Sequence, residues 1–544
     1  MGNLLTVPIP LPCVRPRRVW IGRFLGVLGA GFALPLLLWA YAGAFSRMEA
    51  DDYAMAASAR HLGLWASQWY WYNHWHGRFA MQFSLDGLAI VLPGQVGFLP
   101  PLVLAGWTGA LALALRFGAA LLGISLPWLW AASLSAAGVW TALWLTPQPE
   151  QATWWESGLL TYLVPLAGLW LWAGLAARVC RPGETGTAPP RPKPAALLGL
   201  ALLAFVTGGF SETATGVFLL WLSAGALLLA VQRDTAQKNT AQKNTALPVL
   251  LAGLAGAAAA AVVMVHASGN LIREAYCQPA PNFAFWWAKT WHSALFFTEL
   301  RGWVNESALA ALGGAAALAA FGSAPLPRWR LPYLAVLGLV LIPTLCFASV
   351  VLCFGLTIYA ASSSLPPRAE LMPAAFVAAA VFSMAATAGL LLRAWTHCAS
   401  YRLQAALAAA LALPAAACTG TSLPDWAAAG QSAIRTMTGH ARLCDRQTAF
   451  LAASSGRAVC LGNLSSPAGL PPVGGDPSSW PNRAVASYYG LPLVVESGYV
   501  SHLLTPAEEA QFRRKSRIVP GLTPLVDGVP LRFRWLQAQQ AVLK

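Results

Sequence analysis

The sequence predicts an all-α polytopic membrane protein with about eleven transmembrane helices, a long first outer loop and a small extracytoplasmic α+β domain at the carboxyl terminus. Three observations predict this fold class. Of the 544 residues, 57% are hydrophobic and only 10% are charged, whereas charged residues make up about a quarter of a soluble domain. Apolar runs of membrane-spanning length recur along the first 418 residues. Lys and Arg are concentrated in alternate connecting loops.

The candidate spans are continuous runs of Leu, Ala, Val and Gly. Because these runs do not alternate apolar with polar residues, they predict helices and not the strands of a barrel. We expect spans at 24–44, 99–115, 124–145, 157–177, 195–210, 212–231, 248–266, 303–322, 331–355, 371–392 and 403–418. The first run follows a basic stretch, but it is long and no clear small-residue cleavage site follows it. We therefore interpret it as an uncleaved anchor and not as a signal peptide.

The orientation of the bundle follows from Lys and Arg, which are retained preferentially in short cytoplasmic loops. With the amino terminus inside, sixteen of them fall in cytoplasmic segments before residue 419 and only seven in the outer loops. This bias predicts a multi-pass protein of the inner (plasma) membrane whose segment from about residue 419 lies outside. The net charge of +15 is then mainly a topology signal with a basic tail, and we expect no nucleic-acid partner.

The first outer loop, residues 45–98, is rich in polar and aromatic side chains. Its segment 53–68 has the apolar spacing of a helix, and 79–92 is apolar enough to lie at the membrane interface without spanning. The aromatic residues near these segments are typical of the headgroup level: Trp65, Trp69, Tyr70, Trp71, Tyr72 and Trp75. We expect this loop to lie flat on the outer leaflet.

Acidic residues are concentrated on the same side. Of the thirteen in the first 418 positions, eleven fall on the predicted outer side, headed by Asp51 and Asp52 just after the first span. Carboxylates in this partly desolvated place can take a proton from an acceptor hydroxyl, or can hold a divalent cation such as Mg²⁺ or Mn²⁺. Asp is also a common helix cap, so a purely structural role is an equal alternative.

Six further polar residues lie near the predicted outer ends of the spans. They are Glu156, Glu212, His266, Asn270, Arg273 and Arg368. Each has a structural alternative: the glutamates can be exposed caps, Arg273 can extend its head group to the interface, and Arg368 can pair with Glu370. Their common restriction to one face favours a functional site there. The near absence of ionisable residues inside the spans argues against a proton or ion pathway.

Several motifs follow one another in a characteristic order. They are DDY (51–53), YNHWHGRF (72–79), WWESGLLTYLVP (154–165), GGFSET (208–213), ASGNLIR (267–273), PPRA (366–369) and WPNRAVASYYGLPLV (480–494). Together they resemble a group of bacterial multi-span membrane proteins related to glycosyltransferases of the GT-C fold, of the type that uses polyprenyl-phosphate-linked sugars. The resemblance runs through most of the chain and rests on the order of the motifs. The chain departs from it at ASGN, where APGN is usual, and at Glu156, where an uncharged residue is expected.

The resemblance implies a transferase that moves a sugar, with inversion, from a polyprenyl-phosphate carrier to an envelope glycan, lipid or protein on the outer side. It implies an acidic residue of the first outer loop as base or metal ligand, which maps to Asp51 or Asp52, and we favour Asp51. It also implies Arg273 and Arg368 as ligands of the donor phosphate, since a guanidinium offers a fork of donors to phosphate oxygens. The other expected substrate-binding residues are Tyr53, Trp75, Arg78, Glu156, Glu212, His266 and Asn270.

A polytopic transporter or flippase of envelope precursors is the main alternative, because about a dozen spans with a basic cytoplasmic side also describe such proteins. The lack of charges within the spans and of a visible internal repeat argues against it. A catalytically inactive scaffold is a third interpretation. Loss of the first-loop carboxylates would mark such a scaffold, and both are present here.

We expect two domains, a GT-C-like transmembrane domain over 1–418 and an extracytoplasmic domain over 419–544. The second is rich in Pro and Gly, with a β-like run at 491–495 and a helix-like stretch at 506–517. Cys444 and Cys460 both lie in it and are able to pair in an oxidising compartment. The nine cysteines show no metal-ligand spacing, so we expect no structural metal site.

Overall fold

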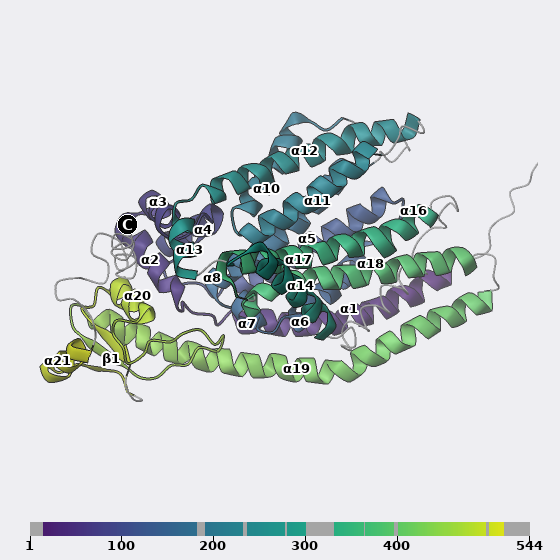
Figure 1. Cartoon of the computed structure of the whole chain (residues 1–544). Helices are drawn as coiled ribbons and strands as arrows, with labels where there is room; N and C mark the ends of the chain where they lie inside the picture. Colours follow the sequence, from purple (N-terminus) through teal and green to yellow (C-terminus); the bar gives the residue numbers. More distant parts are fainter. Residues whose placement is uncertain are drawn as a thin grey trace, which may run out of the picture.

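The computed structural model describes residues 15–181, 191–231, 237–277, 280–300, 331–363, 365–396, 401–496 and 500–515. Long helices form a bundle, and the short helices of the first outer loop lie at one end of it together with a small α+β unit from the carboxyl-terminal part of the chain (Figure 1). The polar loops that the sequence places on the outer side therefore meet at one end of the molecule.

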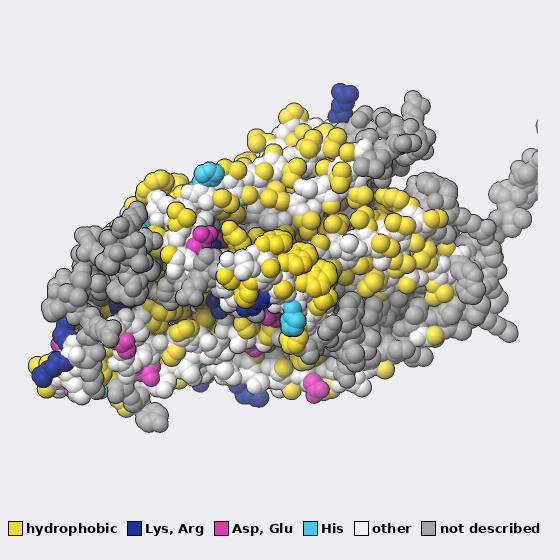
Figure 2. All heavy atoms as spheres, in the orientation of Figure 1, with side chains coloured by type: hydrophobic (Ala, Val, Ile, Leu, Met, Phe, Trp, Pro, Cys, Tyr) yellow, Lys and Arg dark blue, Asp and Glu magenta, His cyan; other side chains and the backbone are white. Residues whose placement is uncertain are grey.

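Seven helical stretches in the described part of the chain are long and apolar enough to cross a membrane, so the protein is a mostly helical, membrane-embedded one. They are Leu99–Leu121, Trp128–Leu145, Glu156–Val179, Glu212–Ala230, Thr245–Val265, Pro332–Ala360 and Pro367–Ala394. Shorter apolar helices at Gly29–Gly43 and Pro194–Gly208 coincide with two more predicted spans. The expected span at 303–322 lies outside the described residues. Figure 2 shows hydrophobic side chains over much of the visible surface of the bundle.

The long helices are labelled in chain order. They are α1 (Arg15–Gly43), α5 (Leu99–Leu121), α6 (Trp128–Leu145), α9 (Val164–Val179), α10 (Pro194–Gly208), α11 (Glu212–Val231), α12 (Gln237–Val265), α14 (Phe283–Leu300), α17 (Ile342–Ala361), α18 (Leu371–Thr396) and α19 (Tyr401–Ala453). Shorter segments extend two of them. The helix α8 (Glu156–Gly158) and the π-helix η1 (Leu159–Leu163) run into α9, while α16 (Leu331–Val336) and the π-helix η3 (Leu337–Leu341) run into α17.

The first outer loop folds into three helices. They are α2 (Asp51–Leu62), α3 (Leu64–His74) and α4 (Phe79–Val91). The helix expected at 53–68 is divided because Gly63 adopts φ 78°, a left-handed conformation that glycine tolerates without a steric penalty. The other short helices at this end are α7 (Pro149–Thr153), α13 (Gly269–Cys277) and the 3₁₀-helix η4 (Pro367–Glu370).

The aromatic residues of this loop do not all face outward. Trp65 and Trp69 are exposed, as a membrane belt requires, whereas Tyr70 and Trp71 are buried in the main core. The indole nitrogen of Trp71 donates a hydrogen bond of 2.7 Å to the Ser58 hydroxyl. The cluster therefore combines an outward-facing pair with residues that hold α2 and α3 together.

The carboxyl-terminal unit begins with α19, which has 53 residues and packs along α1. At about 1.5 Å per residue it is roughly 80 Å long. Because it extends from Tyr401 to Ala453, it continues without a break across the domain boundary expected at 418/419. Beyond it lie β1 (Val459–Leu461), α20 (Trp480–Tyr489), β2 (Val494–Glu496), β3 (His502–Leu503) and α21 (Pro506–Lys515). The strands form one sheet in the order β2-β1-β3, in which β1 is parallel to β2 and antiparallel to β3. This part of the chain thus combines helices with a small sheet. Cys444 and Cys460 do not form the disulfide that the sequence allowed.

Aromatic packing ties the bundle to this end of the molecule. Trp39 of α1 stacks on Trp154, with ring centroids 4.3 Å apart, and its indole nitrogen donates to the Thr153 hydroxyl at 3.0 Å. Trp426 of α19 is buried against Trp140 of α6, with centroids 5.8 Å apart. In lipid, helices associate through such packing and hydrogen bonds and not through the hydrophobic effect. These contacts therefore hold α7 and α19 in fixed positions on the bundle.

Candidate functional site

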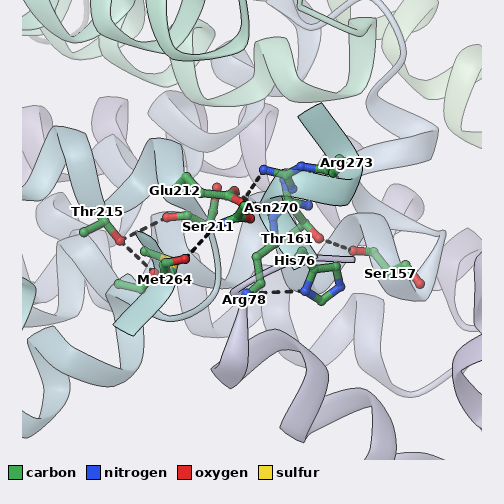
Figure 3. A network of polar contacts seen from close by, with 11 residues as sticks. His76, Arg78, Ser157, Thr161, Ser211, Glu212, Thr215, Met264, Asn270 and Arg273 are labelled. Atoms are coloured by element: carbon green, nitrogen blue, oxygen red, sulfur yellow. Dashed lines mark hydrogen bonds and ion pairs between the residues drawn. The ribbon is translucent and has the colours of Figure 1, made fainter. Parts of the chain in front are cut away.

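The best-defined polar cluster joins three residues from distant parts of the chain. Arg78 precedes α4, Glu212 opens α11 and Arg273 lies in α13. Arg78 Nε is 2.7 Å from Glu212 Oε2, and Arg273 Nη2 is 3.0 Å from Glu212 Oε1 (Figure 3). The three side chains are 23%, 28% and 20% exposed, so the cluster is neither sealed nor freely solvated. Two guanidinium groups share one carboxylate, which leaves a net charge of +1.

Hydrogen bonds dock the turn that carries Arg78 onto the neighbouring helix ends. The Ala80 amide donates to the Gly209 carbonyl at 3.0 Å, which ties the start of α4 to the turn before α11. The Tyr72 hydroxyl donates to the Val263 carbonyl at 2.7 Å, which ties α3 to the end of α12. The turn between α3 and α4 is therefore held between the two segments that supply Glu212 and Arg273.

Two glycines allow this close approach. A Cβ atom built on Gly77 would overlap the backbone of Met264, and one on Gly269 would overlap the backbone of Trp75. Real Cβ atoms essentially never come so close to a backbone atom, and a backbone cannot yield as a flexible side chain does. The glycines in the HGRF and ASGN motifs thus have a packing function that brings the arginines together.

His76 lies beside the cluster and was not among the residues expected from the sequence. It is 3% exposed, its ring is stacked with Trp71 at a centroid distance of 6.3 Å, and its Nδ1 accepts a hydrogen bond from the Arg78 amide at 3.3 Å. Burial lowers the pKa of His76 to about 3, and the charges of Arg78 and Arg273 act in the same direction. The ring is therefore neutral near pH 7, with its proton on Nε2. Nε2 is buried and has no hydrogen-bond partner among the described residues.

Asp52 is almost fully enclosed, at 1% exposure. Its Oδ1 accepts hydrogen bonds from the Ser157 amide at 3.1 Å and the Ser157 hydroxyl at 2.5 Å, and its Oδ2 accepts one from the Glu49 amide at 3.1 Å. Burial raises the pKa of Asp52 to about 7; the hydrogen bonds from Ser157 and Glu49 oppose this shift, and the charge of Asp51 adds to it. Asp52 thus fastens the start of α2 to the start of the span that begins at Glu156.

Glu156 lies next to the hydrogen bonds between Asp52 and Ser157. It is 7% exposed and lines the same small cavity as Asp52, about 10 Å³ in volume, which is room for roughly one water molecule. The cavity is otherwise lined mainly by apolar side chains, among them Met55 and Leu85. Glu156 is therefore placed beside Asp52 and within the packed interior of this end of the bundle.

Asp51 has different surroundings from its neighbour. It is half-buried at the first position of α2, and it is the more accessible of the two carboxylates. Both oxygens of Asp52 are already engaged by N–H and O–H donors, which a cation would have to displace. Asp51 and Asp52 consequently do not fit a shared divalent cation. In the part of the chain that the structure describes, no group of three or more His, Cys, Asp or Glu residues is arranged to hold a metal ion.

Arg368 is engaged at a different place from Arg273. Its Nη1 donates to Gln151 Oε1 at 3.0 Å, and its guanidinium lies 5.4 Å from the centre of the Trp155 ring. Gln151 in turn donates to the Ala468 carbonyl at 2.7 Å. The partner of Arg273 in the basic cluster is therefore Arg78, while Arg368 links η4 to α7 and, through Gln151, to the carboxyl-terminal unit.

The remaining predicted site residues make mainly structural contacts. Tyr53 packs edge-on against Tyr488 at a centroid distance of 5.5 Å, and Trp75 is a partly buried residue at the end of α3. His266 is exposed, and its Nδ1 lies 2.9 Å from the Val262 carbonyl of its own helix. The Asn270 amide group donates to the Met264 carbonyl at 2.7 Å, which closes the end of α12.

A second group that the sequence did not single out lies between the first outer loop and α19. Glu49 Oε1 is 3.0 Å from His440 Nε2, and Cys444 Sγ is 3.1 Å from the same nitrogen. Burial, with the charge of Glu49, raises the pKa of Cys444 to about 12, so this thiol is protonated near pH 7. Two features of the sequence pointed to members of this group without joining them: Glu49 precedes Asp51 by two residues, and Cys444 was a candidate for pairing with Cys460.

Comparison with protein-family models, with curated proteins and with solved structures found no match to this chain.

Proposed function

We propose that the protein is a membrane glycosyltransferase that moves a sugar from a polyprenyl-phosphate carrier to an envelope acceptor on the extracytoplasmic side. One observation carries the proposal: Arg78 and Arg273 share Glu212 and leave a partly exposed site with a net charge of +1 at one end of an apolar bundle. A lipid-linked phosphate requires this combination of a basic site and an adjacent membrane. The order of the sequence motifs supports the same class.

The basic cluster suits a phosphate leaving group. Each guanidinium carries five N–H donors, of which Glu212 engages only part, so donors remain for phosphate oxygens. Glu212 also holds the two arginines in place before the substrate arrives. Preorganised donors directed at developing negative charge stabilise a transition state more than mobile ones do. The buried Nε2–H of His76 is a further neutral donor beside the cluster.

The acceptor side of the reaction is assigned to the start of α2. Asp51 would take the proton from the acceptor hydroxyl while the oxygen of that hydroxyl attacks the anomeric carbon of the donor sugar. In the same step the bond from the anomeric carbon to the phosphate oxygen breaks, and the polyprenyl phosphate leaves. Asp52 is then a positioning residue, because its three hydrogen bonds fix α2 relative to the bundle. The proposed topology has eleven spans in the plasma membrane, with the amino terminus inside the cell and the carboxyl-terminal unit outside.

The test is transfer of labelled sugar from polyprenyl-phosphate donors by the purified full-length protein in lipid. Arg273→Gln is expected to lower the rate by about 10²- to 10³-fold, because it removes a charged donor from the leaving phosphate. Asp51→Asn is expected to lower it strongly without loss of folding. Arg513→Gln is the matched control, since Arg513 lies in α21 and pairs with Glu509.

Two outcomes would overturn the proposal. One is wild-type protein that transfers sugar from none of the donors but moves the lipid-linked sugar across the bilayer, which would favour the flippase alternative. The other is a normal transfer rate in folded Arg273→Gln protein.

A further inference from the structure

A cavity of about 80 Å³ lies between the start of α2 and the carboxyl-terminal unit. Three parts of the chain line it: residues 48–53 of the first outer loop, 440–451 of α19, and 461–496 of the α+β unit. At roughly 15 Å³ for each water position, it holds a handful of water molecules or one small polar end group. The cavity therefore lies between the loop that carries Asp51 and the carboxyl-terminal unit, which has no role in the proposed reaction as described above.

The lining of this cavity is acidic. Glu49 and Glu496 contribute carboxylates, and the lining residues include no Lys or Arg. Its formal charge is −2 with His440 neutral and −1 with His440 protonated. An anionic ligand such as a phosphate would be repelled, whereas an ammonium group would be attracted. The cavity thus has the opposite charge to the basic cluster of Arg78, Glu212 and Arg273.

Glu49 has an unused hydrogen-bonding atom in this place. Its Oε1 is engaged by His440, but Oε2 is buried and has no hydrogen-bond partner among the described residues. A buried carboxylate oxygen without a partner loses its hydration without compensation. A ligand that brings an N–H or O–H donor into the cavity would supply the missing partner. Hydroxyl and amide groups of Gln447, Thr448 and Ser466 line the same space.

The backbone around Glu49 is held in an unusual conformation. Ala50 has φ 51° and ψ −116°, a combination that residues with a side chain rarely adopt. It is held there by the Asp52 carboxylate, which accepts from the Glu49 amide and is itself fastened to Ser157. Such strain persists only where the surrounding contacts fix it, and it is concentrated at functional sites. Here it places Glu49 at the cavity two residues before Asp51.

We propose that this cavity binds the acceptor through a protonated amino group flanked by hydroxyls, as in an amino sugar, with Glu49 as the carboxylate that receives the ammonium. This inference rests on the proposed glycosyltransferase function, because it names the chemical class of the acceptor. The two substrates are then separated by charge: the phosphate of the donor goes to the basic cluster, and the cationic end of the acceptor goes to the acidic cavity.

The test is equilibrium binding of glucosamine to the full-length protein in lipid nanodiscs, without donor and below the pKa of the amine. Glucosamine is expected to bind the wild type, and Glu49→Gln is expected to weaken binding at least about tenfold, as loss of a buried charge-assisted hydrogen bond would. Glu496→Gln is a second variant in case Glu49→Gln does not fold. Glu509→Gln is the matched control, because Glu509 lies in α21 outside the cavity lining.

Equal binding of glucosamine to wild type and folded Glu49→Gln protein would overturn the inference. The inference would also be overturned if glucose 6-phosphate displaced labelled glucosamine from the wild type as effectively as unlabelled glucosamine does. Because the readout is binding without donor, the two proposals fail separately. Normal sugar transfer with no glucosamine binding removes the acceptor assignment alone, whereas glucosamine binding without transfer from any donor removes the glycosyltransferase function.

Discussion

Asp51 and Asp52 are neighbours in the chain, yet their side chains have different surroundings. Successive residues of a helix point about 100° apart, so adjacency along the chain does not imply shared burial. Asp52 turns inward to the two donors of Ser157, while Asp51 is half-buried. The sequence suggested a carboxylate pair acting on one substrate; the structure separates the pair into an accessible acid and an enclosed one.

The enclosed acid gives a prediction about stability and pH. The folded-state pKa of Asp52 is about 7, above its usual value of 3.8, so folding favours the protonated form. The stabilisation from Asp52 is therefore fully present below pH 3.8 and is lost as the pH rises through 7. Asp52→Asn is expected to reduce the change of stability between pH 3.8 and 7. The measurement is the Tm of the wild type and the variant at pH values across this window, in detergent or lipid.

The control for this experiment is Glu509→Gln, in which a partly exposed carboxylate of α21 is neutralised. It is expected to keep the wild-type pH dependence. An Asp52→Asn variant with the same change of Tm across the window as the wild type would contradict the prediction.

At the scale of elements, apolar periodicity located helices well and their ends less well. The helix-like stretch 506–517 contains α21 (Pro506–Lys515), so that expected helix is confirmed. The stretch 79–92, expected only to lie at the membrane interface, forms the helix α4 (Phe79–Val91). The division at Gly63 was not expected, because it depends on a positive φ that periodicity does not report. The continuation of α19 past residue 418 was also not expected, since the change in composition there coincides with no break in the helix.

The docked turn between α3 and α4 gives a second prediction. Gly77→Ala places a Cβ atom against the Met264 backbone and should displace the turn that carries Arg78. Overpacking of this kind costs about 1–3 kcal/mol. We expect a lower Tm and a sugar-transfer rate that falls with the displacement of Arg78.

Gly87 provides the matched control within the adjacent helix. A Cβ atom at Gly87 meets nothing within 4 Å, and Ala is a better helix former than Gly by about 0.5–1 kcal/mol. Gly87→Ala should therefore leave Tm unchanged or raise it, with normal transfer. Equal effects of the two substitutions would show that close backbone approach at Gly77 is not important.

At the scale of the whole molecule, polar chemistry is concentrated at one end. The first outer loop contributes to the basic cluster, to the hydrogen bonds of Asp52 and to the acidic cavity. Ends of the bundle helices complete the first two, and the carboxyl-terminal unit completes the cavity. That unit is held by contacts with the loop and the bundle, including the bidentate pair of Arg47 and Asp445 at 2.7 and 2.9 Å. The functional end is thus a joint product of segments from both ends of the chain.

Sidedness is the third prediction, and it belongs to the molecule as a whole. Because Lys and Arg favour the cytoplasmic side, the loop after α5 should lie inside and α21 outside. In intact cells, a membrane-impermeant thiol reagent should label Arg513→Cys. It should label Ser125→Cys, in the exposed loop between α5 and α6, only after the membrane is opened, with wild-type labelling subtracted. Labelling of both variants, or of Ser125→Cys alone, in intact cells would contradict the topology.

The sequence by itself determined that the protein is helical and membrane-embedded, since hydrophobicity and span length are properties of local stretches of chain. It also placed Arg78, Glu212 and Arg273 among the candidates, because they lie in motifs that follow one another in a characteristic order. Glu212 and Arg273 stood out as well by their position near the predicted outer ends of the spans. Only the tertiary structure decided that these three form one cluster, that Arg368 contacts Gln151 instead, and that Glu49 pairs with His440 in the wall of a cavity. The physical reason is that burial and charge pairing depend on contacts between segments that are far apart in the chain, by 61 residues for Glu212 and Arg273 and by 217 for Gln151 and Arg368, which local patterns do not encode.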